Sequence, residues 1–308
     1  MSTVRPLRPS DVDEVITRIE RRLKADADFQ PLINPAFSSD LLDNALRHAA
    51  HATWVAEDRD RMVGHLYGAL LEDDAHGRGV WVGPDGASFD DVDTLGELYA
   101  VAGASWIADG AHDHYVWTLD DDSTVEPWLE MGFARMHRRG VVALPRPRVH
   151  PLPDGYSIRR GTASDFELAV ELDAALDDAQ RLGPSFAFAA PGSSRDELAE
   201  TLADPETHHY LVERSGVGIS QCITFALPAR RGSFDASLHH SAVTVRAEHR
   251  GRGVATAMVD AALSDALGAG FTHAETNWRV TNRRAQRFWR TYGFGATYVR
   301  LHRSVAAR

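Results

Sequence analysis

The chain has 308 residues, of which 44% are hydrophobic and 25% charged, and a formal net charge of −11. These values predict a soluble globular protein with one large or two ordinary domains. A single cysteine, Cys222, excludes a disulfide framework and a cysteine metal site. No apolar run of about 18 residues occurs, and the first residues do not resemble a signal peptide, so we expect a cytoplasmic location.

The negative charge is concentrated in the first half of the sequence. Residues 1–145 contain 13 basic and 26 acidic side chains, whereas residues 146–308 contain 20 basic and 18 acidic ones. An acidic half repels nucleic acids and anionic membranes, so we expect neither as a partner. It either attracts a cationic substrate or forms a solvated surface that aids solubility.

The first half alternates strand-like and helix-like segments. Apolar residues recur at helical spacing after Ser10 and again from Leu95, with short β-rich runs between these segments. We expect, in chain order, a strand over 4–8, helices over 10–23 and 39–50, strands over 53–56, 62–70 and 79–82, a helix over 95–107, a strand over 115–119 and a helix over 125–133.

Four prolines lie within residues 145–153 and interrupt the periodic pattern. Such a composition is typical of a stiff, extended linker. We therefore expect two domains, residues 1–145 and residues 146–308.

The second half repeats the order of elements of the first. Two copies of a β-α-α-β-β-β-α-β-α-β order, each closing on a Gly-Phe pair, predict an α/β fold built from tandem repeats. We expect strands over 156–160, 210–214, 219–227, 242–245 and 272–277, and helices over 164–172, 195–202, 254–268 and 282–292.

A glycine-rich turn with the sequence HRGRGVA, residues 249–255, joins the strand 242–245 to the next helix. Its glycines leave no Cβ between the backbone and a ligand, and the first N–H groups of a helix have no helical partner. Together with Arg250 and Arg252, the positive end of the helix dipole favours an anion of pyrophosphate size. Taken alone, the turn is equally well explained as a solvated basic turn that caps the helix.

The glycine spacing excludes two well-known phosphate loops. A Walker A loop needs G-x-x-x-x-G-K-[ST], and no glycine here precedes a lysine. A dinucleotide loop needs G-x-G-x-x-G, but Gly251 and Gly253 are followed by Thr256 where the third glycine would lie.

The turn and the last helix resemble two motifs of one enzyme superfamily. Arg250-x-x-Gly253-x-Ala255 resembles the [QR]-x-x-G-x-[GA] loop that holds the pyrophosphate of acetyl-CoA in the GNAT superfamily of N-acetyltransferases. Residues 282–294, NRRAQRFWRTYGF, resemble its N-x-x-A-x-x-[FL]-Y-x-x-x-G-F helix, and Trp289 is the one mismatch. The resemblance covers about residues 156–303.

This resemblance implies a fold and an activity. Each repeat should be a mixed, mostly antiparallel sheet with helices on both faces, and strands 242–245 and 272–277 should separate so that acetyl-CoA wedges between them. The implied reaction is acetyl-CoA-dependent transfer of an acetyl group to a primary amine of a small molecule. A homodimer is compatible with this plan.

The resemblance also assigns residues to the acetyl-CoA cosubstrate. The loop would hold the pyrophosphate, and polar side chains near the last helix resemble those that bind the pantetheine arm, although Asn277 could instead tie neighbouring strands. The predicted contacts are Val243, Val245, Arg250, Gly251, Arg252, Gly253, Val254, Ala255, Thr276, Asn277 and Asn282.

The first repeat lacks an equivalent loop. The segment 83–91 has three acidic residues where the second repeat has basic ones, and acidic side chains repel a pyrophosphate. The earlier triplet 77–79, Gly-Arg-Gly, precedes a strand, so a hairpin turn explains it. By resemblance, the first half is a degenerate GNAT repeat that has lost its CoA loop.

Acyl transfer to an amine requires a base near the thioester carbon. His239, on the strand before the loop, resembles the position where several GNAT enzymes have a catalytic Glu or His. His240 should point to the opposite face of the sheet. His239 could instead be a hydrogen-bonded wall residue, and Glu275 on the neighbouring strand is the second candidate base.

The acid that protonates the leaving CoA thiolate is not evident from the sequence. In the GNAT superfamily it is commonly the tyrosine that Trp289 replaces here, and an indole N–H cannot serve as this acid. Tyr292, three residues later on the same helical face, is the candidate; it could also only pack beneath the sulfur, or the thiolate could leave directly to solvent.

Two further alternatives remain open. Phe186 and Phe188 lie where the family usually builds the acceptor site, and we expect them to be buried packing residues or, alternatively, parts of a lid. The chain could also be a CoA-binding module without catalytic activity, whose repeats form a protein-binding surface.

Overall fold

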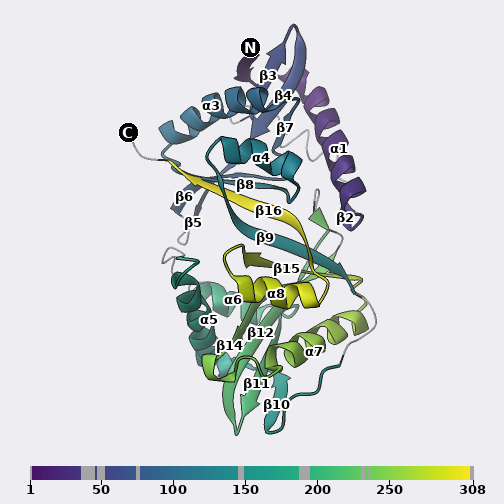
Figure 1. Ribbon diagram of the computed structural model, residues 1–308, viewed down its shortest axis with the longest axis vertical. Helices are drawn as coiled ribbons and strands as arrows, with labels where there is room; N and C mark the ends of the chain where they lie inside the picture. The colour runs from purple at the N-terminus through teal and green to yellow at the C-terminus, as the bar shows by residue number, and fades with distance from the viewer. Residues whose placement is uncertain are drawn as a thin grey trace. The chain divides into compact units, whose positions relative to one another are not determined.

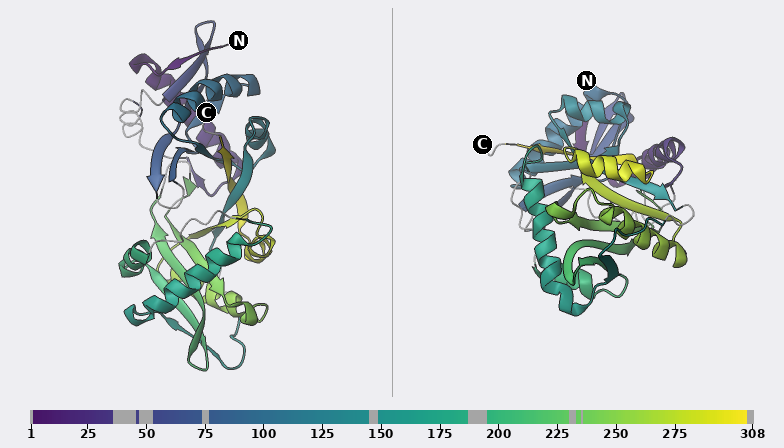
Figure 2. Two further views of the ribbon diagram at one scale, coloured as in Figure 1. Left: turned by 90° about the vertical axis from the view of Figure 1, so that its left-hand side faces the viewer. Right: turned by 60° about the horizontal axis from the view of Figure 1, so that its bottom comes forward.

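The computed structural model describes residues 2–35, 46, 53–73, 77–144, 149–186, 195–229, 233–234 and 236–305. The chain divides into two compact units, each with strands flanked by helices (Figures 1 and 2). Unit 1 comprises Met1–Arg139, Arg230–Phe234 and Ala296–Arg308, and unit 2 comprises Gly140–Ala229 and Asp235–Gly295.

Unit 1 is built from two groups of paired strands. One group has the order β1-β3-β4-β7 and the other the order β16-β8-β6-β5, while β13 pairs with β2. Its elements are β1 (Thr3–Pro6), α1 (Val12–Phe29), β2 (Ile33–Asn34), β3 (Thr53–Asp58), β4 (Arg61–Tyr67), β5 (Ala69–Asp73), β6 (Gly77–Val82), β7 (Ala87–Phe89), α3 (Val92–Ala108), β8 (Asp113–Leu119), α4 (Asp122–Glu130), β13 (Ser233–Phe234) and β16 (Gly295–Ser304).

An aromatic cluster forms the centre of unit 1. The ring of Tyr99 on α3 lies 5.3 Å from that of Phe133 and 6.3 Å from that of Trp128, both edge-on. Such pairs add to the free energy gained by burying the rings. The buried side of α1 carries Val12, Val15, Ile19 and Leu23, the helical spacing expected from the sequence.

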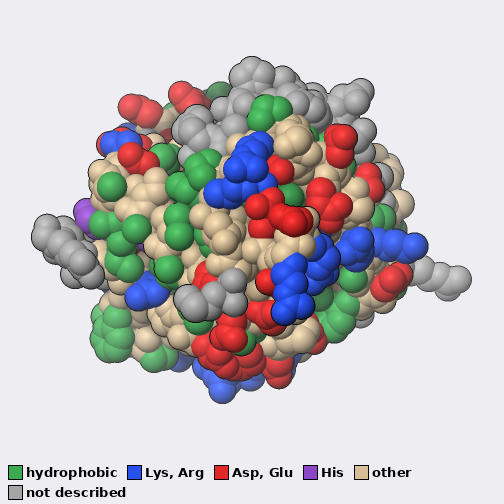
Figure 3. Space-filling view, turned by 90° about the horizontal axis from the view of Figure 1, so that it is seen from above, with side chains coloured by type: hydrophobic (Ala, Val, Ile, Leu, Met, Phe, Trp, Pro, Cys, Tyr) green, Lys and Arg blue, Asp and Glu red, His purple; other side chains and the backbone are tan. Residues whose placement is uncertain are grey.

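The acidic excess of unit 1 is partly compensated by ion pairs. Arg5 contacts the carboxylates of Asp11 and Glu57, and Arg18 lies 2.6 Å from Asp90. On the face seen in Figure 3, acidic and basic side chains likewise lie next to one another. This arrangement favours a solvated, internally paired surface over a uniformly negative one.

Unit 2 contains a mixed sheet with the strand order β10-β11-β12-β14-β15. The first three pairings are antiparallel and β14–β15 is parallel, which confirms the predicted mixed, mostly antiparallel sheet. Its elements are β10 (Tyr156–Arg160), α5 (Phe166–Arg181), α6 (Arg195–Ala203), β11 (His208–Arg214), β12 (Val217–Leu227), β14 (Ser237–Val245), α7 (Val254–Gly268), β15 (His273–Arg279) and α8 (Arg283–Thr291). The chain enters unit 2 along β9 (Ala134–Ala143).

Helices cover both faces of the unit 2 sheet, as predicted. On one face Met258 of α7 packs against Cys222 of β12. On the other face Ala169 of α5 and Leu198 of α6 pack against Ile223 of β12. Consecutive residues of β12 therefore point to opposite helix layers. In the described part of the chain, no helix is long and apolar enough to cross a membrane.

The strands of unit 1 differ from the expected ones at β4 and β5 and at β7. The predicted strand 62–70 is two strands, β4 and β5, with different partners. The chain changes partner at Gly68, where a Cβ would lie only 2.4 Å from Val80. The short strand β7, which pairs with β4, had no recognisable pattern in the sequence. The predicted helix 39–50, apart from Leu46, and linker residues 145–148 lie outside the described residues.

The compact units differ from the division at 145/146 expected from the linker. The chain passes from unit 1 to unit 2 between Arg139 and Gly140, inside β9. The last strand, β16, pairs antiparallel with β8, and residues 296–308 count with unit 1. The last strand of the second repeat thus contributes to the first unit.

Candidate functional site

A cavity of about 730 Å³ opens in unit 2 where the C-terminal part of α5, the end of β14 and the starts of α7 and α8 meet. Its volume is within the range of small-molecule sites. The side chains and backbone that form it are Leu176, Ala179, Leu182–Ser185, Val243–Val245, His249–Gly251, Gly253–Thr256, Thr281–Ala285 and Arg287–Trp289.

The glycine loop forms one end of this cavity. Gly251 and Gly253 have φ values of 73° and 83°, and Gly253 is the N-cap of α7 in the left-handed conformation. A Cβ at either position would meet nothing within 4 Å. Glycine is therefore needed here for the backbone conformation and not because neighbouring atoms crowd it.

The start of α7 offers backbone donors to the cavity. The first hydrogen bond of regular helical spacing runs from Ala257 N to Gly253 O, at 3.0 Å, so the three preceding N–H groups have no helical acceptor. No side chain caps this end, and the first turn contains no acidic residue. Arg250 donates its Nε–H to Val245 O at 2.9 Å, which holds the guanidinium at the rim.

Strands β14 and β15 separate beside the loop, as predicted from the sequence. They pair only over Leu238–His240 and Ala274–Thr276. Both strands are described in full, and β14 continues to Val245 without a pairing residue on β15. Apart from Val245 O, which accepts from Arg250, the backbone of β14 along this stretch has no partner on β15 and can bond to a ligand there.

Helix α8 begins at a side-chain cap, which accounts for the asparagine at the start of its motif. The side chain of Asn282 accepts a hydrogen bond from Ala285 N at 3.0 Å and caps the helix. Phe288 and Trp289 then lie along the cavity wall.

Comparison with known proteins identifies this region. Residues 175–294 match the model of the acetyltransferase (GNAT) family. This part of the chain belongs to the GNAT family. It includes the cavity, the glycine loop and α8, so the predicted identification as a GNAT-type acetyltransferase is confirmed for this segment. No curated protein matches the chain in sequence.

GNAT proteins of known structure share the fold of the whole chain. The GCN5-related N-acetyltransferase from Sphaerobacter thermophilus is 18% identical, over 98% of this chain and 95% of that one, with a TM-score of 0.65. A tandem GNAT protein from the clavulanic acid biosynthesis pathway is 18% identical over 99% of each chain, with a TM-score of 0.56. At these identities the likeness shows the fold alone, and it confirms the predicted tandem GNAT architecture.

Most of the residues predicted to contact acetyl-CoA in the GNAT domain lie around the cavity. Those that line it are Val243, Val245, Arg250, Gly251, Gly253, Val254, Ala255 and Asn282. Arg252 and Asn277 are exposed and lie outside the lining. Thr276 is buried and donates its hydroxyl to His240 O at 3.1 Å, so it ties the last paired residues of β14 and β15 together.

The two candidate bases lie next to each other at the end of the paired region. His239 and Glu275 are register partners, one residue before the strands separate. The ring of His239 lies 5.1 Å from that of Phe225, which shares a sheet face with Ile223, so both face the side covered by α5 and α6. Glu275 is buried and accepts a hydrogen bond from Ser237 at 2.7 Å. Neither side chain lines the cavity.

His240 points to the opposite face, as predicted. Its ring lies 5.6 Å from that of Trp289 and 6.3 Å from that of Phe294. Burial lowers the pKa of His240 to about 3, so this imidazole is neutral at physiological pH. His240 is therefore a packing residue behind the cavity wall.

The position of Tyr292 does not support its predicted role as an acid. Its hydroxyl donates to Thr256 O at 2.8 Å. The side chain lines a second cavity of about 440 Å³, which includes His150, Pro151 and Thr291, and it lies outside the lining of the first.

The turn after α5 forms one wall of the cavity through Leu182–Ser185, which were not among the predicted acetyl-CoA contacts. Ser185 hydrogen-bonds to Thr281 at 2.8 Å, and Arg279 donates to Gln180 at 2.6 Å, so the turn is tied to the segment before α8. Phe186 in this turn is 75% exposed, so the expectation that it is buried is wrong. Pro184 indicated in the sequence that the helix ends here. The side-chain contacts of the turn join residues far apart in the sequence, so no local pattern predicted them. Phe188 lies outside the described residues.

The acidic side chains of loop 83–91 in the first repeat form contacts with other residues of unit 1. Asp85 accepts from the Tyr67 hydroxyl at 2.6 Å, and Asp91 caps α3 by accepting from Thr94 N at 2.7 Å. Asp90 pairs with Arg18. Strand β6 is paired with β8 up to its last residue, Val82, so these two strands do not separate as β14 and β15 do.

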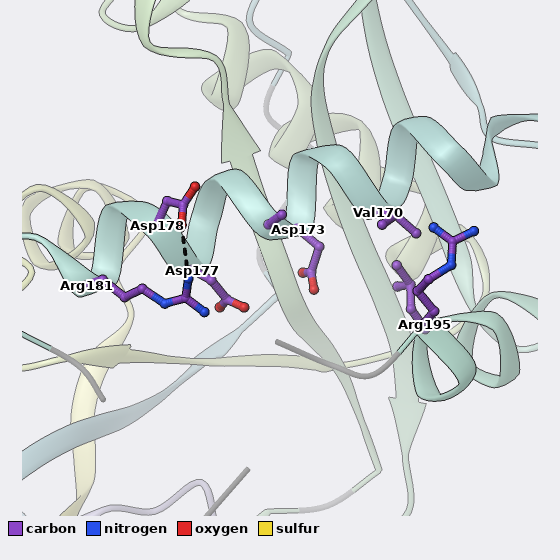
Figure 4. A pocket seen from close by; sticks show the side chains of 8 residues that line it. Val170, Asp173, Asp177, Asp178, Arg181 and Arg195 are labelled. Carbon is purple, nitrogen blue, oxygen red and sulfur yellow. Dashed lines mark hydrogen bonds and ion pairs between the residues drawn. The ribbon is translucent and has the colours of Figure 1, made fainter. Parts of the chain in front are cut away.

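A smaller cavity of about 140 Å³ lies between α5 and α6 of the GNAT domain (Figure 4). Asp173 and Asp177 extend into it from the same side of α5. Burial, and then repulsion by Asp177, raise the pKa of Asp173 to about 6. Burial likewise raises the pKa of Asp177.

Replacing Asp173 with asparagine is expected to stabilise the protein at pH 7.5. The folded-state pKa of about 6 exceeds the ordinary value of 3.8, so the folded state binds a proton more tightly and stability falls as pH rises from about 4 to 6. In the wild-type protein this loss of stability is about 1 kcal/mol after solvent screening is taken into account. The asparagine variant does not titrate and therefore lacks the loss. Thermal unfolding should show a Tm higher by about 2–4 °C at pH 7.5 and little change at pH 4.

The matched control for this comparison is Asp178→Asn, which removes an exposed carboxylate paired with Arg181 at 3.2 Å. We expect it to leave Tm nearly unchanged at both pH values, because exposed pairs contribute little. An equal gain in both variants would show that general charge, and not the buried carboxylate, is responsible.

Proposed function

We propose that the protein transfers an acetyl group from acetyl-CoA to a primary amine of a small molecule, with one active site, in unit 2. The observation that carries this proposal is the coincidence of two features at one cavity. The uncapped, acid-free start of α7 meets the point where β14 and β15 separate. A ligand with a pyrophosphate and an extended amide-containing arm matches both features.

The chain's own groups would bind the two parts of CoA differently. The free N–H groups at the start of α7, with Arg250, favour the pyrophosphate through hydrogen bonds and the helix dipole. The backbone of β14 between Val243 and Val245 has no partner on β15. Apart from Val245 O, which accepts from Arg250, it can exchange hydrogen bonds with the amides of the pantetheine arm, as an added strand would. The thioester would then lie near the last paired residues of the two strands.

We propose that His239 accepts the proton of the attacking amine. The amine nitrogen forms a bond to the thioester carbon, the carbon–sulfur bond breaks, and the nitrogen gives up a proton to the imidazole. His239 faces the side of the sheet covered by α5 and α6, so the amine would approach from that side. Glu275, its register partner, is the alternative base or a group that orients the ring.

The CoA thiolate is proposed to leave to solvent. Trp289 lies on the cavity wall, and its indole N–H is not an acid of suitable strength. The Tyr292 hydroxyl is engaged with Thr256 O. A thiolate is a tolerable leaving group near neutral pH, so the reaction does not require a protein acid. The predicted homodimer is no part of this proposal.

An amine panel tests the proposed function. Purified full-length protein is mixed with acetyl-CoA and primary amines of varied size and charge, and free CoA thiol is measured against an amine-free control. We expect thiol release that depends on a particular amine and is lost in Gly253→Asp. Binding of acetyl-CoA without release by any amine would instead favour a non-catalytic CoA-binding module.

A further inference from the structure

The described helices of the chain differ in the charge of their first turns. The helices α1, α3, α4, α5 and α6 each carry acidic residues there, which is the arrangement that the helix dipole favours. Only α7 and α8, among the helices that the structure describes, have none. These are the two helices whose first turns line the cavity.

Helix α8 goes further, because its start is strongly basic. Arg283, Arg284 and Arg287 lie in its first five residues, line the cavity and are exposed. Cations at this end of a helix oppose the dipole and repel one another. The placement therefore destabilises α8 unless an anion lies among these side chains.

The chain itself supplies no such anion in its described part. No carboxylate there forms an ion pair with these three arginines, and the only hydrogen bond of their side chains within the described residues runs from Arg283 Nη1 to Gln286 Oε1 at 3.2 Å. Elsewhere in unit 2, Arg160, Arg195 and Arg246 each lie 2.5 to 2.7 Å from a carboxylate. Within the described residues, Arg283, Arg284 and Arg287 thus lack the carboxylate partners that these three other arginines have.

We propose that Arg283, Arg284 and Arg287 form a second phosphate subsite, separate from the start of α7, which takes the phosphomonoester of the bound cosubstrate. This inference rests on the proposed function. In acetyl-CoA that group is the 3′-phosphate of the adenosine, which is distinct from the pyrophosphate. Guanidinium groups suit a phosphomonoester because their paired N–H donors match two of its oxygens.

A direct test compares acetyl-CoA with acetyl-3′-dephospho-CoA by calorimetry on the full-length protein. We expect wild-type protein to bind acetyl-CoA about 10- to 100-fold more tightly, as removal of one charge-assisted contact pair should produce. In the double variant Arg284→Ala and Arg287→Ala this ratio should fall to about 1 to 3, because acetyl-CoA weakens and the dephospho compound does not. Arg283 is retained because it contacts Gln286.

The matched control is Arg290→Ala, which removes an exposed arginine of the same helix that does not line the cavity. It should keep the wild-type ratio. Equal affinity of wild-type protein for the two compounds would overturn the proposal. An equal loss of affinity for both compounds in the double variant would also overturn it, because it would show only a general electrostatic attraction of the arginines for an anionic ligand. Failure of wild-type protein to bind either compound would overturn the proposed function as well.

Discussion

Replacing His239 with alanine is expected to lower kcat/KM by about 10²- to 10⁴-fold, the usual contribution of a general base. The affinity for acetyl-CoA should stay nearly unchanged, because the imidazole lies outside the lining of the cavity and faces the α5 and α6 side of the sheet. Steady-state kinetics with the accepted amine and calorimetry with acetyl-CoA measure the two quantities separately.

The pH dependence should change in the same variant. An imidazole accepts a proton only when it is neutral, so a histidine base gives the wild-type kcat/KM profile a limb that rises with pH. His239→Ala should lose this limb. A variant with lower activity but an unchanged profile would indicate that His239 is a wall residue.

Glu275→Gln is the control for this assignment, because Glu275 is the register partner of His239 and is also buried. The glutamine keeps the size of the side chain and can still accept the hydrogen bond from Ser237. We expect a smaller loss than in His239→Ala. A deeper loss with the histidine limb intact would transfer the role of base to Glu275.

Replacing Gly253 with aspartate is expected to weaken acetyl-CoA binding by more than about 10²-fold. The new side chain must adopt a φ of 83° and brings a negative charge to the start of α7, where the pyrophosphate is proposed to lie. Each effect opposes binding, and charge repulsion in the cavity should be the larger one. Calorimetric Kd values measure the loss.

Gly270→Asp provides a matched control at the other end of the same helix. Gly270 has a φ of 89°, and a Cβ there would also meet nothing within 4 Å. The two variants therefore share the backbone strain and the added charge, and only Gly253 lines the cavity. Gly270→Asp should change the affinity by less than about 3-fold. Similar losses in both would point to unfolding instead of a local effect.

The sequence was most informative where structure depends on neighbouring residues. The apolar periodicity of α1 and α7 and the glycine loop at 251–253 are local signals, and they predicted the two helices and the turn, although α1 continues to Phe29, beyond the predicted end at residue 23. The pairing of strands distant in sequence carries no such signal. The change of partner at Gly68 and the pairing of β16 with β8 in unit 1 therefore could not be predicted.

In the candidate site, too, the residues that belong to local motifs were predictable and those placed by long-range contacts were not. The loop and Asn282 were found because motifs specify them, whereas the wall formed by Leu182–Ser185 depends on side-chain contacts such as Ser185 with Thr281. The arginines of α8 are evident in the sequence. That three of them line the cavity follows only from the position of the helix in the fold. Tyr292 shows the reverse case, since a suitable helical spacing did not bring its hydroxyl to the cavity.

Isothermal titration of the full-length protein with acetyl-CoA most directly measures whether a single acetyl-CoA site lies in unit 2. In unit 1, Asp85, Asp90 and Asp91 occupy the loop and β6 stays paired with β8 to its end. We therefore predict one site per chain, which Gly253→Asp removes. A stoichiometry of two, or a site that survives Gly253→Asp with wild-type affinity, would contradict the assignment.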